Sequence, residues 1–212
     1  MPADLSPLRV ALTGGIATGK SHCLRTFAAL GVRTLDSDVL AREAVEPGTA
    51  GLEAVLVRFG RGLLRPDGTL DRAALGRIVF ADPTARRDLE AIIHPLVFAA
   101  IRARTGSPSR TPSGLGPEVL SIADIPLLYE SGHAGDFDRV VVAACRPDQQ
   151  LERLMARDGL SEADARQRIG TQLPIEVKAE RADYVIDTSG PLADTDRQVA
   201  RVLEKLLGEG RR

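Results

Sequence analysis

Short runs of apolar and β-branched residues recur along the chain and alternate with longer stretches of helical periodicity. The runs lie at residues 8–12, 32–35, 119–123, 139–144 and 184–186. Strands that alternate with helices indicate a parallel sheet covered by helices. Residues 140–145, VVVAAC, are apolar on both alternating faces, which is typical of a strand with helices on each side. The pattern therefore predicts an α/β fold with a doubly wound, parallel, five-stranded sheet.

A long, mostly helical stretch separates the second run from the third. Turns with Gly and Pro break it at EPGT, FGRG and RPDG. Asp82 and Pro83 are typical of a cap and first turn, and they predict a helix from Thr84 to about Arg104. We interpret residues 49–104 as a helical insertion in one domain, whose core comprises residues 1–48 and 118–212.

Two further segments are distinguished by their composition. Residues 105–117 are nearly all Gly, Pro, Ser, Thr and Arg, which predicts a flexible surface loop. Residues 147–182 form an Arg-rich helical region before the last strand, and a final helix is expected at about residues 192–207. The chain shows no internal repeat.

Charge and composition exclude several classes of protein. The 212 residues carry a formal net charge of −1, so no overall field favours nucleic acid or an anionic membrane as a partner. No apolar run is long enough to span a bilayer, and the first residues lack the pattern of a signal peptide, so a cytoplasmic protein is expected. Cys23 and Cys145 are expected to be reduced, buried thiols. Lysine occurs only at Lys20, Lys178 and Lys205, and each therefore requires an explanation.

One glycine-rich segment carries the strongest chemical signal. Residues 14–21, Gly14-Gly15-Ile16-Ala17-Thr18-Gly19-Lys20-Ser21, match the pattern G-x-x-x-x-G-K-[ST] directly after an expected strand and before an expected helix. Glycines let successive N–H groups point at phosphates, and the helix N-terminus adds partial positive charge. Lys20 would reach the β- and γ-phosphates and Ser21 would bind Mg²⁺, so ATP with Mg²⁺ is the expected ligand.

The remaining motifs favour a small-molecule kinase over other phosphate-loop proteins. A chain without Asn cannot contain the N-K-x-D motif with which GTPases read guanine. An ATPase motor or transporter subunit would need a partner surface or a signature loop, and neither is evident. A small-molecule kinase needs a carboxylate near the acceptor hydroxyl, an acceptor pocket and arginines on a lid. We interpret residues 49–104 as the acceptor-binding part and residues 151–175 as the lid.

Carboxylates follow two of the expected strands, at the edge where open α/β sheets bind ligands. Asp38 could accept the hydroxyl proton, or it could merely cap the next helix; for Asp36 a cap or packing role is favoured. Asp124 could hold Mg²⁺, directly or through water, or be a turn residue. The arginines that could clamp phosphate are Arg153, Arg157, Arg166 and Arg168, of which two or three at most would act.

These motifs, taken in order, resemble the dephospho-CoA kinase family over nearly the whole chain. The segments that carry the resemblance are LTGGIATGKS, LDSDVLAREAVEPGT, DGTLDR, IIHP, DIPLLYE, LERLMARDGLSEADARQRIGTQ and ADYVIDTSG. The resemblance implies ATP-dependent phosphorylation of the ribose 3′-hydroxyl of dephospho-CoA. It implies catalytic roles for Asp38, Lys20 and Arg153, and ATP contacts from residues 14–21, His22 and Arg157. It also implies that Asp38, His94, Asp124 and Pro126 contact the acceptor, and that Ser21 and Asp124 bind Mg²⁺.

The chain departs from the family pattern at three places. The family usually has Gly-Ser or similar where this chain has Ala17-Thr18, Thr where it has His22, and Asn where it has Thr188. These differences concern the nucleotide contacts rather than the chemistry. On composition alone His94 is also a common helix-packing residue. A nucleoside or nucleotide kinase is the alternative enzyme, and a nucleotide-binding module without turnover is the alternative of another class.

Overall fold

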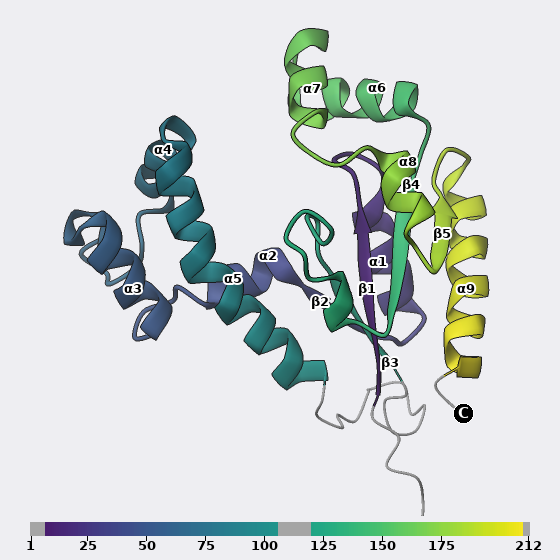
Figure 1. Ribbon diagram of the computed structural model, residues 1–212, viewed down its shortest axis with the longest axis horizontal. Helices are drawn as coiled ribbons and strands as arrows, with labels where there is room; N and C mark the ends of the chain where they lie inside the picture. The colour runs from purple at the N-terminus through teal and green to yellow at the C-terminus, as the bar shows by residue number, and fades with distance from the viewer. Residues whose placement is uncertain (1–6, 106–119, 210–212) are drawn as a thin grey trace, which may run out of the picture. The chain divides into compact units, whose positions relative to one another are not determined.

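The computed structural model describes residues 7–105 and 120–209, and its core is a five-stranded parallel sheet in the order β2-β3-β1-β4-β5 (Figure 1). The strands are β1 (Leu8–Gly14), β2 (Arg33–Asp36), β3 (Leu120–Asp124), β4 (Arg139–Ala144) and β5 (Tyr184–Asp187). The doubly wound α/β fold expected from the hydrophobic pattern is confirmed, and the strands agree with the apolar runs to within two residues.

The register of the central strands brings their carboxyl ends to one edge of the sheet. Leu12 of β1 lies opposite Asp124 of β3, and Gly14 of β1 lies opposite Ala143 of β4. In a parallel sheet this is the edge at which ligands bind. The register therefore brings the start of the glycine-rich loop and the carboxylate of β3 to the same edge.

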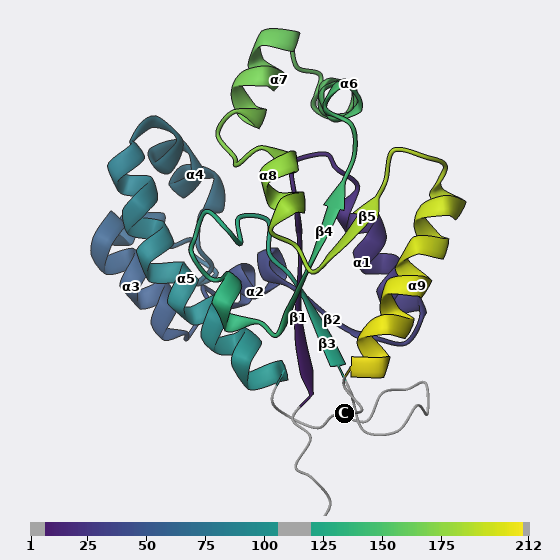
Figure 2. The same ribbon diagram turned by 45° about the vertical axis from the view of Figure 1, so that its right-hand side comes forward.

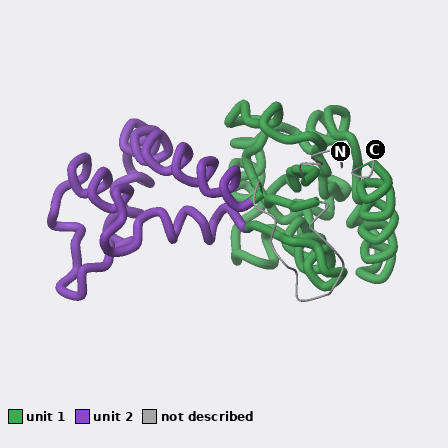
Figure 3. Tube along the Cα trace, turned by 90° about the horizontal axis from the view of Figure 1, so that it is seen from below, with its two compact units in different colours: residues 1–35, 105–212 green, residues 36–104 purple. Residues whose placement is uncertain are grey.

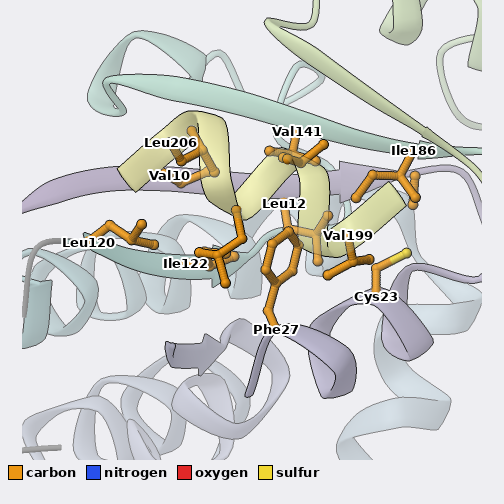
Figure 4. Close-up of a cluster of buried hydrophobic side chains, with 13 residues drawn as sticks. Val10, Leu12, Cys23, Phe27, Leu120, Ile122, Val141, Ile186, Val199 and Leu206 are labelled. Atoms are coloured by element: carbon orange, nitrogen blue, oxygen red, sulfur yellow. The ribbon is translucent and has the colours of Figure 1, made fainter. Parts of the chain in front are cut away.

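Helices cover both faces of the sheet because its central strands are apolar on both faces. Figure 2 shows α1 (Lys20–Ala29) and α9 (Leu192–Glu209) on one side and α8 (Ile175–Glu180) on the other. Figure 4 shows the core between the sheet and the helices α1 and α9, where Phe27 of α1 and Val199 of α9 pack against Leu12 and Val141. Burial of these side chains, at about 1.5–3 kcal/mol each, holds α1 and the preceding loop on the sheet.

The chain divides into two compact units, which Figure 3 colours separately: residues 1–35 with 105–212, and residues 36–104. The second unit contains α2 (Ser37–Glu43), α3 (Ala50–Phe59), the 3₁₀ helix η1 (Arg61–Leu63), α4 (Arg72–Ala81) and most of α5 (Pro83–Thr105). The helical insertion is therefore larger than residues 49–104. Its own core explains why, because Val45, just after α2, packs with Leu52 and Val55.

The turns and caps expected in the insertion correspond to its element ends. Thr49 caps α3 through a bond from the Leu52 N–H to its hydroxyl, 3.1 Å long, and Asp71 caps α4. The Asp82 carboxylate accepts a hydrogen bond of 2.7 Å from the Thr84 N–H, and α5 runs to Thr105. The loop expected at residues 105–117 lies outside the described residues, except for Thr105.

The Arg-rich region contains three helices in the first unit. These are α6 (Pro147–Asp158), α7 (Glu162–Ile169) and α8, and a 3₁₀ helix, η2 (Ala134–Asp136), precedes β4. The stretch at residues 151–175 predicted as a lid thus comprises most of α6, all of α7 and the start of α8. Across residues 7–105 and 120–209, no helix combines the length and the apolarity that a membrane span requires.

Candidate active site

The glycine-rich loop connects β1 to α1, as expected for a phosphate loop, and it needs its glycines for two different reasons. A Cβ at Gly14 would lie 2.6 Å from the carbonyl oxygen of Ala143, so only glycine permits this approach of β1 to β4. Gly19 caps α1 with a φ of 86°, in the left-handed region that glycine adopts without strain. The sequence therefore forms a tight turn that ends in a helix N-terminus at Lys20.

Ala17, where the chain departs from the family pattern, has a strained backbone conformation. Its φ is 60°, and it is the one residue other than glycine with a positive φ among residues 7–105 and 120–209. The left-handed region costs an L-residue about 1–2 kcal/mol. The rest of the loop must therefore hold Ala17 in place.

Side chains from distant segments supply that support. The side-chain oxygen Oε1 of Gln172 accepts a bond of 2.8 Å from the Ile16 N–H, and the side-chain amide of Gln150 donates to the backbone carbonyl oxygen of Ile16 over 2.9 Å. The Thr188 hydroxyl lies 2.6 Å from the carbonyl oxygen of Thr18. Thr188 thus joins the loop to the turn after β5, where the family usually has Asn. Sequence reasoning assigned no role to either glutamine.

Lys20 and Asp124 form an ion pair at the carboxyl edge of the sheet. Nζ of Lys20 is bonded to Oδ1 of Asp124, and the Asp124 residue is only 5% exposed. A buried carboxylate is stabilised by such a partner. The structure thus brings together the two side chains predicted to bind phosphate and metal. The turn-residue interpretation of Asp124 does not account for this pairing, because a turn aspartate needs no buried cation.

The available oxygen ligands fit a magnesium ion that arrives with ATP. Ser21 is an exposed residue in the first turn of α1, next to Lys20, and Asp124 supplies a carboxylate. Mg²⁺ in nucleotide sites uses one or two protein oxygens, with phosphate oxygens and water completing its coordination. Within the part of the chain that the structure describes, no three His, Cys, Asp or Glu side chains gather to hold a metal. A magnesium ion that binds together with ATP does not need a full set of protein ligands.

The predicted lid arginines have different surroundings. Arg153 on α6 donates a hydrogen bond of 2.8 Å to the carbonyl oxygen of Thr188, which places it beside the support of the phosphate loop. Arg157 and Arg168 both bind the Asp158 carboxylate, at 2.7 and 2.6 Å. The bond from Arg157 lowers the pKa of Asp158 below its ordinary value. Such exposed pairs contribute little free energy, and phosphate contacts by these guanidinium groups stay a prediction.

Arg166 is the fourth candidate arginine, and it pairs along its own helix. It binds Glu162, one turn earlier on α7, over 2.7 Å. This is an exposed pair between residues four apart, typical of a solvated helix surface.

In the second unit, Asp36 and not Asp38 caps α2. Oδ1 of Asp36 accepts hydrogen bonds from the N–H groups of Asp38, at 2.8 Å, and Val39, at 3.3 Å. The cap role favoured for Asp36 is thus observed. Asp38 lies in the first turn of α2 with its side chain exposed, so capping does not explain it.

The other predicted contacts have structural partners within their own units. His94 on α5 packs edge-to-face on Phe98, with ring centroids 6.5 Å apart. His22 lies 2.8 Å from the Asp196 carboxylate of α9, and a bond from Thr26, together with this contact, lowers the pKa of Asp196. The carbonyl oxygen of Pro126 accepts a bond of 3.3 Å from the Thr13 hydroxyl. Their contacts with substrates stay predictions.

Both cysteines are free and buried, as expected from the sequence. Burial raises the pKa of the Cys23 thiol to about 12, although α1 begins only three residues earlier. Burial also raises the pKa of Cys145. The first turn of a helix usually favours a thiolate. Burial is the stronger effect at Cys23, so this thiol is chemically inert.

This burial predicts slow thiol labelling. At pH 8 a pKa near 12 leaves about one Cys23 thiolate in 10⁴, so iodoacetamide should leave native protein unmodified at this residue over an hour. The same reagent in denaturant should modify both cysteines, and mass spectrometry counts the adducts. Rapid labelling of Cys23 in the native protein would show that the start of α1 opens.

The parallel sheet, the loop of residues 14–21 and the Lys20–Asp124 pair define a phosphate-loop kinase. Solved kinase structures share this fold. The chain matches shikimate kinase from Acinetobacter baumannii with a TM-score of 0.55 at 18% identity, over 98% of this chain and 97% of that one. At that identity the match concerns the fold alone.

Closer relatives identify the family. The family model for dephospho-CoA kinase matches residues 8–194. Dephospho-CoA kinase of Anaeromyxobacter dehalogenans (strain 2CP-C) is 48% identical, with 96% of this chain and 94% of that protein aligned. The solved dephospho-CoA kinase from Campylobacter jejuni has a TM-score of 0.71 at 28% identity, over 95% and 98% of the two chains. TT1252 from Thermus thermophilus reaches 0.73 at 34% identity, over 94% and 98%. The chain belongs to the dephospho-CoA kinase family.

Proposed function

We propose that this chain transfers the γ-phosphoryl group of ATP to the ribose 3′-hydroxyl of dephospho-CoA, giving CoA and ADP in the last step of CoA synthesis. The observation that carries this proposal is the family match over residues 8–194, which includes an intact phosphate loop. The reaction needs little covalent chemistry from the protein, since positioning and charge stabilisation account for most of the catalysis of phosphoryl transfer.

The first unit supplies the groups for ATP. The N–H groups of the loop and the α1 N-terminus bind the phosphates, and Lys20 leaves Asp124 to neutralise charge on the β- and γ-phosphates. Ser21 and Asp124 would hold Mg²⁺, which screens the phosphate charge when it is bound. The charge of the buried Asp124 would then be balanced by Lys20 in the absence of ATP and by Mg²⁺ in its presence. The Lys20–Asp124 pair is therefore a resting arrangement of the site.

The second unit supplies the group that receives the proton. Asp38 accepts the proton of the 3′-hydroxyl as that oxygen bonds to the γ-phosphorus and the bond to the β-phosphate oxygen breaks, so that ADP leaves. Its exposure leaves it open to the acceptor, and the Asp36 cap fixes the start of its helix. Arg153 and Arg157 stabilise the charge that develops on the transferred group.

The acceptor is recognised along its length. Dephospho-CoA carries a nucleoside end and a pantetheine arm, and the helical unit of residues 36–104 is larger than ATP binding alone requires. His94, Pro126 and Asp124 are proposed to contact it. Contacts remote from the reacting hydroxyl contribute binding energy that fixes the pose for in-line attack. A cytoplasmic location is part of the same proposal.

The arm-dependent pose predicts a steep preference among acceptors. With ATP and Mg²⁺ present, kcat/KM for dephospho-CoA should exceed that for adenosine or AMP by at least about tenfold, because the fragments lack the contacts that orient the hydroxyl. ADP release in a coupled assay gives the rates, and phosphorus NMR locates the new phosphate. Lys20→Ala protein provides the background rate. Equal or better use of AMP or adenosine would indicate a nucleotide or nucleoside kinase, and ATP binding without acceptor-dependent ADP release would indicate a binding module.

A further inference from the structure

Lys178 on α8 is fully buried, with no exposed surface, although lysine is almost never fully buried unless it is paired. Its ammonium group lies 2.8 Å from Oε1 of Glu130 and donates to the carbonyl oxygens of Gly14, at 3.3 Å, and Pro126, at 3.4 Å. An ammonium group has three donors, and these contacts employ all of them. Burial of an ion requires such compensation. The partners therefore indicate what the residue is for.

The three contacts join the two segments that carry the ionic groups of the site. Gly14 ends β1 and begins the phosphate loop, and Pro126 lies two residues after Asp124. The ammonium group of Lys178 thus holds the backbone at two points. One point is the start of the loop that carries Lys20, and the other is close to Asp124. Glu130 balances the charge of Lys178. Lys178 therefore acts on the site by positioning the backbone rather than through a long-range electrostatic field.

The bond to Gly14 fixes the direction of the first peptide group of the loop. The described chain has no cis peptide bond, so the carbonyl of Gly14 and the N–H of Gly15 point in opposite directions. An ammonium group bonded to that carbonyl therefore sets the orientation of the Gly15 N–H. The loop cannot rotate this peptide without leaving a buried ammonium donor unsatisfied, which is costly for a charged group.

Residues close to Lys178 in sequence also contact the phosphate loop or Glu130. We call Gln172, Leu173, Lys178 and Glu130 together the loop bracket. Gln172 accepts the Ile16 N–H over 2.8 Å. Glu130 accepts the Leu173 N–H over 3.0 Å with the same oxygen that faces Lys178. A lysine that only filled the core would have no reason to bond the loop, and these contacts converge on residues 14–16.

We propose that Lys178, held by Glu130, is a positioning residue for phosphoryl transfer that preforms the phosphate loop for ATP. The proposal rests on the function assigned above only in that it requires residues 14–21 to bind a nucleoside triphosphate. Lys178 does not touch the reacting atoms. It acts through the backbone of Gly14, and its loss should therefore weaken nucleotide binding rather than abolish the chemistry.

The test compares variants in the binding of adenylyl imidodiphosphate with Mg²⁺, measured by calorimetry at a temperature where circular dichroism shows each variant folded. Lys178→Met keeps most of the length of the side chain without its donors, and it should raise the dissociation constant by about tenfold or more. Hydrogen exchange of the peptide that covers residues 14–20 should become faster. Lys205→Met is the matched control, because Lys205 is exposed on α9, and it should bind like the wild type.

A double-mutant cycle tests whether the pair acts as a unit. Glu130→Gln keeps the shape and an acceptor oxygen but removes the charge, and it should weaken binding less than Lys178→Met does. The double variant should be no worse than Lys178→Met alone, since the partners depend on each other. A purely structural role instead predicts lower melting temperatures with unchanged dissociation constants and unchanged loop exchange, and that result would overturn the proposal.

A third variant covers the case in which Lys178→Met does not fold. Gln172→Leu removes the acceptor of the Ile16 N–H and leaves the buried ion pair intact. If Gln172→Leu and Glu130→Gln both bind the analogue as tightly as the wild type, the loop bracket has no positioning role. Wild-type turnover of dephospho-CoA is measured separately. A protein that binds the analogue but does not phosphorylate dephospho-CoA would contradict the assigned acceptor and leave the effect of Lys178 measurable.

Discussion

Replacing Lys20 by alanine is expected to lower kcat by about 10³-fold while the protein stays folded. Lys20 is the first residue of α1, and its side chain extends to Asp124 rather than into the core between α1 and the sheet. In the proposed reaction its ammonium group neutralises charge on the phosphoryl group as that group transfers. The loss should therefore appear mainly in kcat, measured as ADP release under saturating ATP and dephospho-CoA.

The same substitution disturbs a buried ion pair, so stability must be measured with it. Removal of one partner of a buried pair destabilises a protein by about 3–5 kcal/mol when the other charge is left uncompensated. Lys205→Ala, an exposed position, is the control for loss of a lysine, and thermal unfolding by circular dichroism reports the fold. If folded Lys20→Ala protein kept most of its turnover, residues 14–21 would not be a phosphate loop.

The parts of the fold that follow local rules could be predicted from the sequence. Apolar runs in β1 and β4 and the glycine-rich turn after β1 carry their signals within a few residues. The cap at Asp36 followed from its position before a helix, and the structure shows it. The second compact unit begins at residue 36 rather than at residue 49, a start that no local signal marks, and Val45, just after α2, packs in the core of that unit with Leu52 and Val55.

The supports of the phosphate loop could not be predicted, since they come from distant parts of the chain. Lys178 and Gly14 are 164 residues apart, and Gln172 and Ile16 are 156 apart. The scarcity of lysine marked Lys178 as a residue that needs an explanation, but composition cannot say what a side chain touches. Only the fold, which brings Lys178 of α8 to the end of β1 and to Pro126 after β3, supplies that information.

Two of the departures from the family pattern acquire a joint explanation. Ala17 keeps a positive φ without the freedom of glycine, and the next residue, Thr18, is held from both sides. The Thr18 hydroxyl donates a hydrogen bond of 2.9 Å to the carbonyl oxygen of Gly15. The Thr188 hydroxyl lies 2.6 Å from the carbonyl oxygen of Thr18. Thr18 and Thr188 thus hold the strained turn, and the two substitutions at opposite ends of the chain support one loop.

Asp38→Asn is expected to slow phosphoryl transfer by about 10²-fold, the scale on which a positioned base contributes. The amide is nearly isosteric with the carboxylate but cannot take up the hydroxyl proton at neutral pH. Because Asp36 provides the cap of α2, the substitution removes no cap, and folding should be unaffected. Single-turnover measurements with saturating ATP and dephospho-CoA separate the chemical step from product release.

Asp36→Ala is the matched control for Asp38→Asn, because it lies in the same turn and has the opposite expected profile. Loss of the bonds to the N–H groups of Asp38 and Val39 should lower the free energy of unfolding by about 1 kcal/mol, the usual contribution of an N-cap. Its single-turnover rate should fall far less than that of Asp38→Asn. Adenylyl imidodiphosphate should bind both variants like the wild type, because the proposed ATP groups lie in the first unit. If Asp38→Asn matched the wild-type single-turnover rate, Asp38 would not be the base, and the proton of the 3′-hydroxyl would have to pass to another acceptor, such as the phosphoryl oxygens themselves.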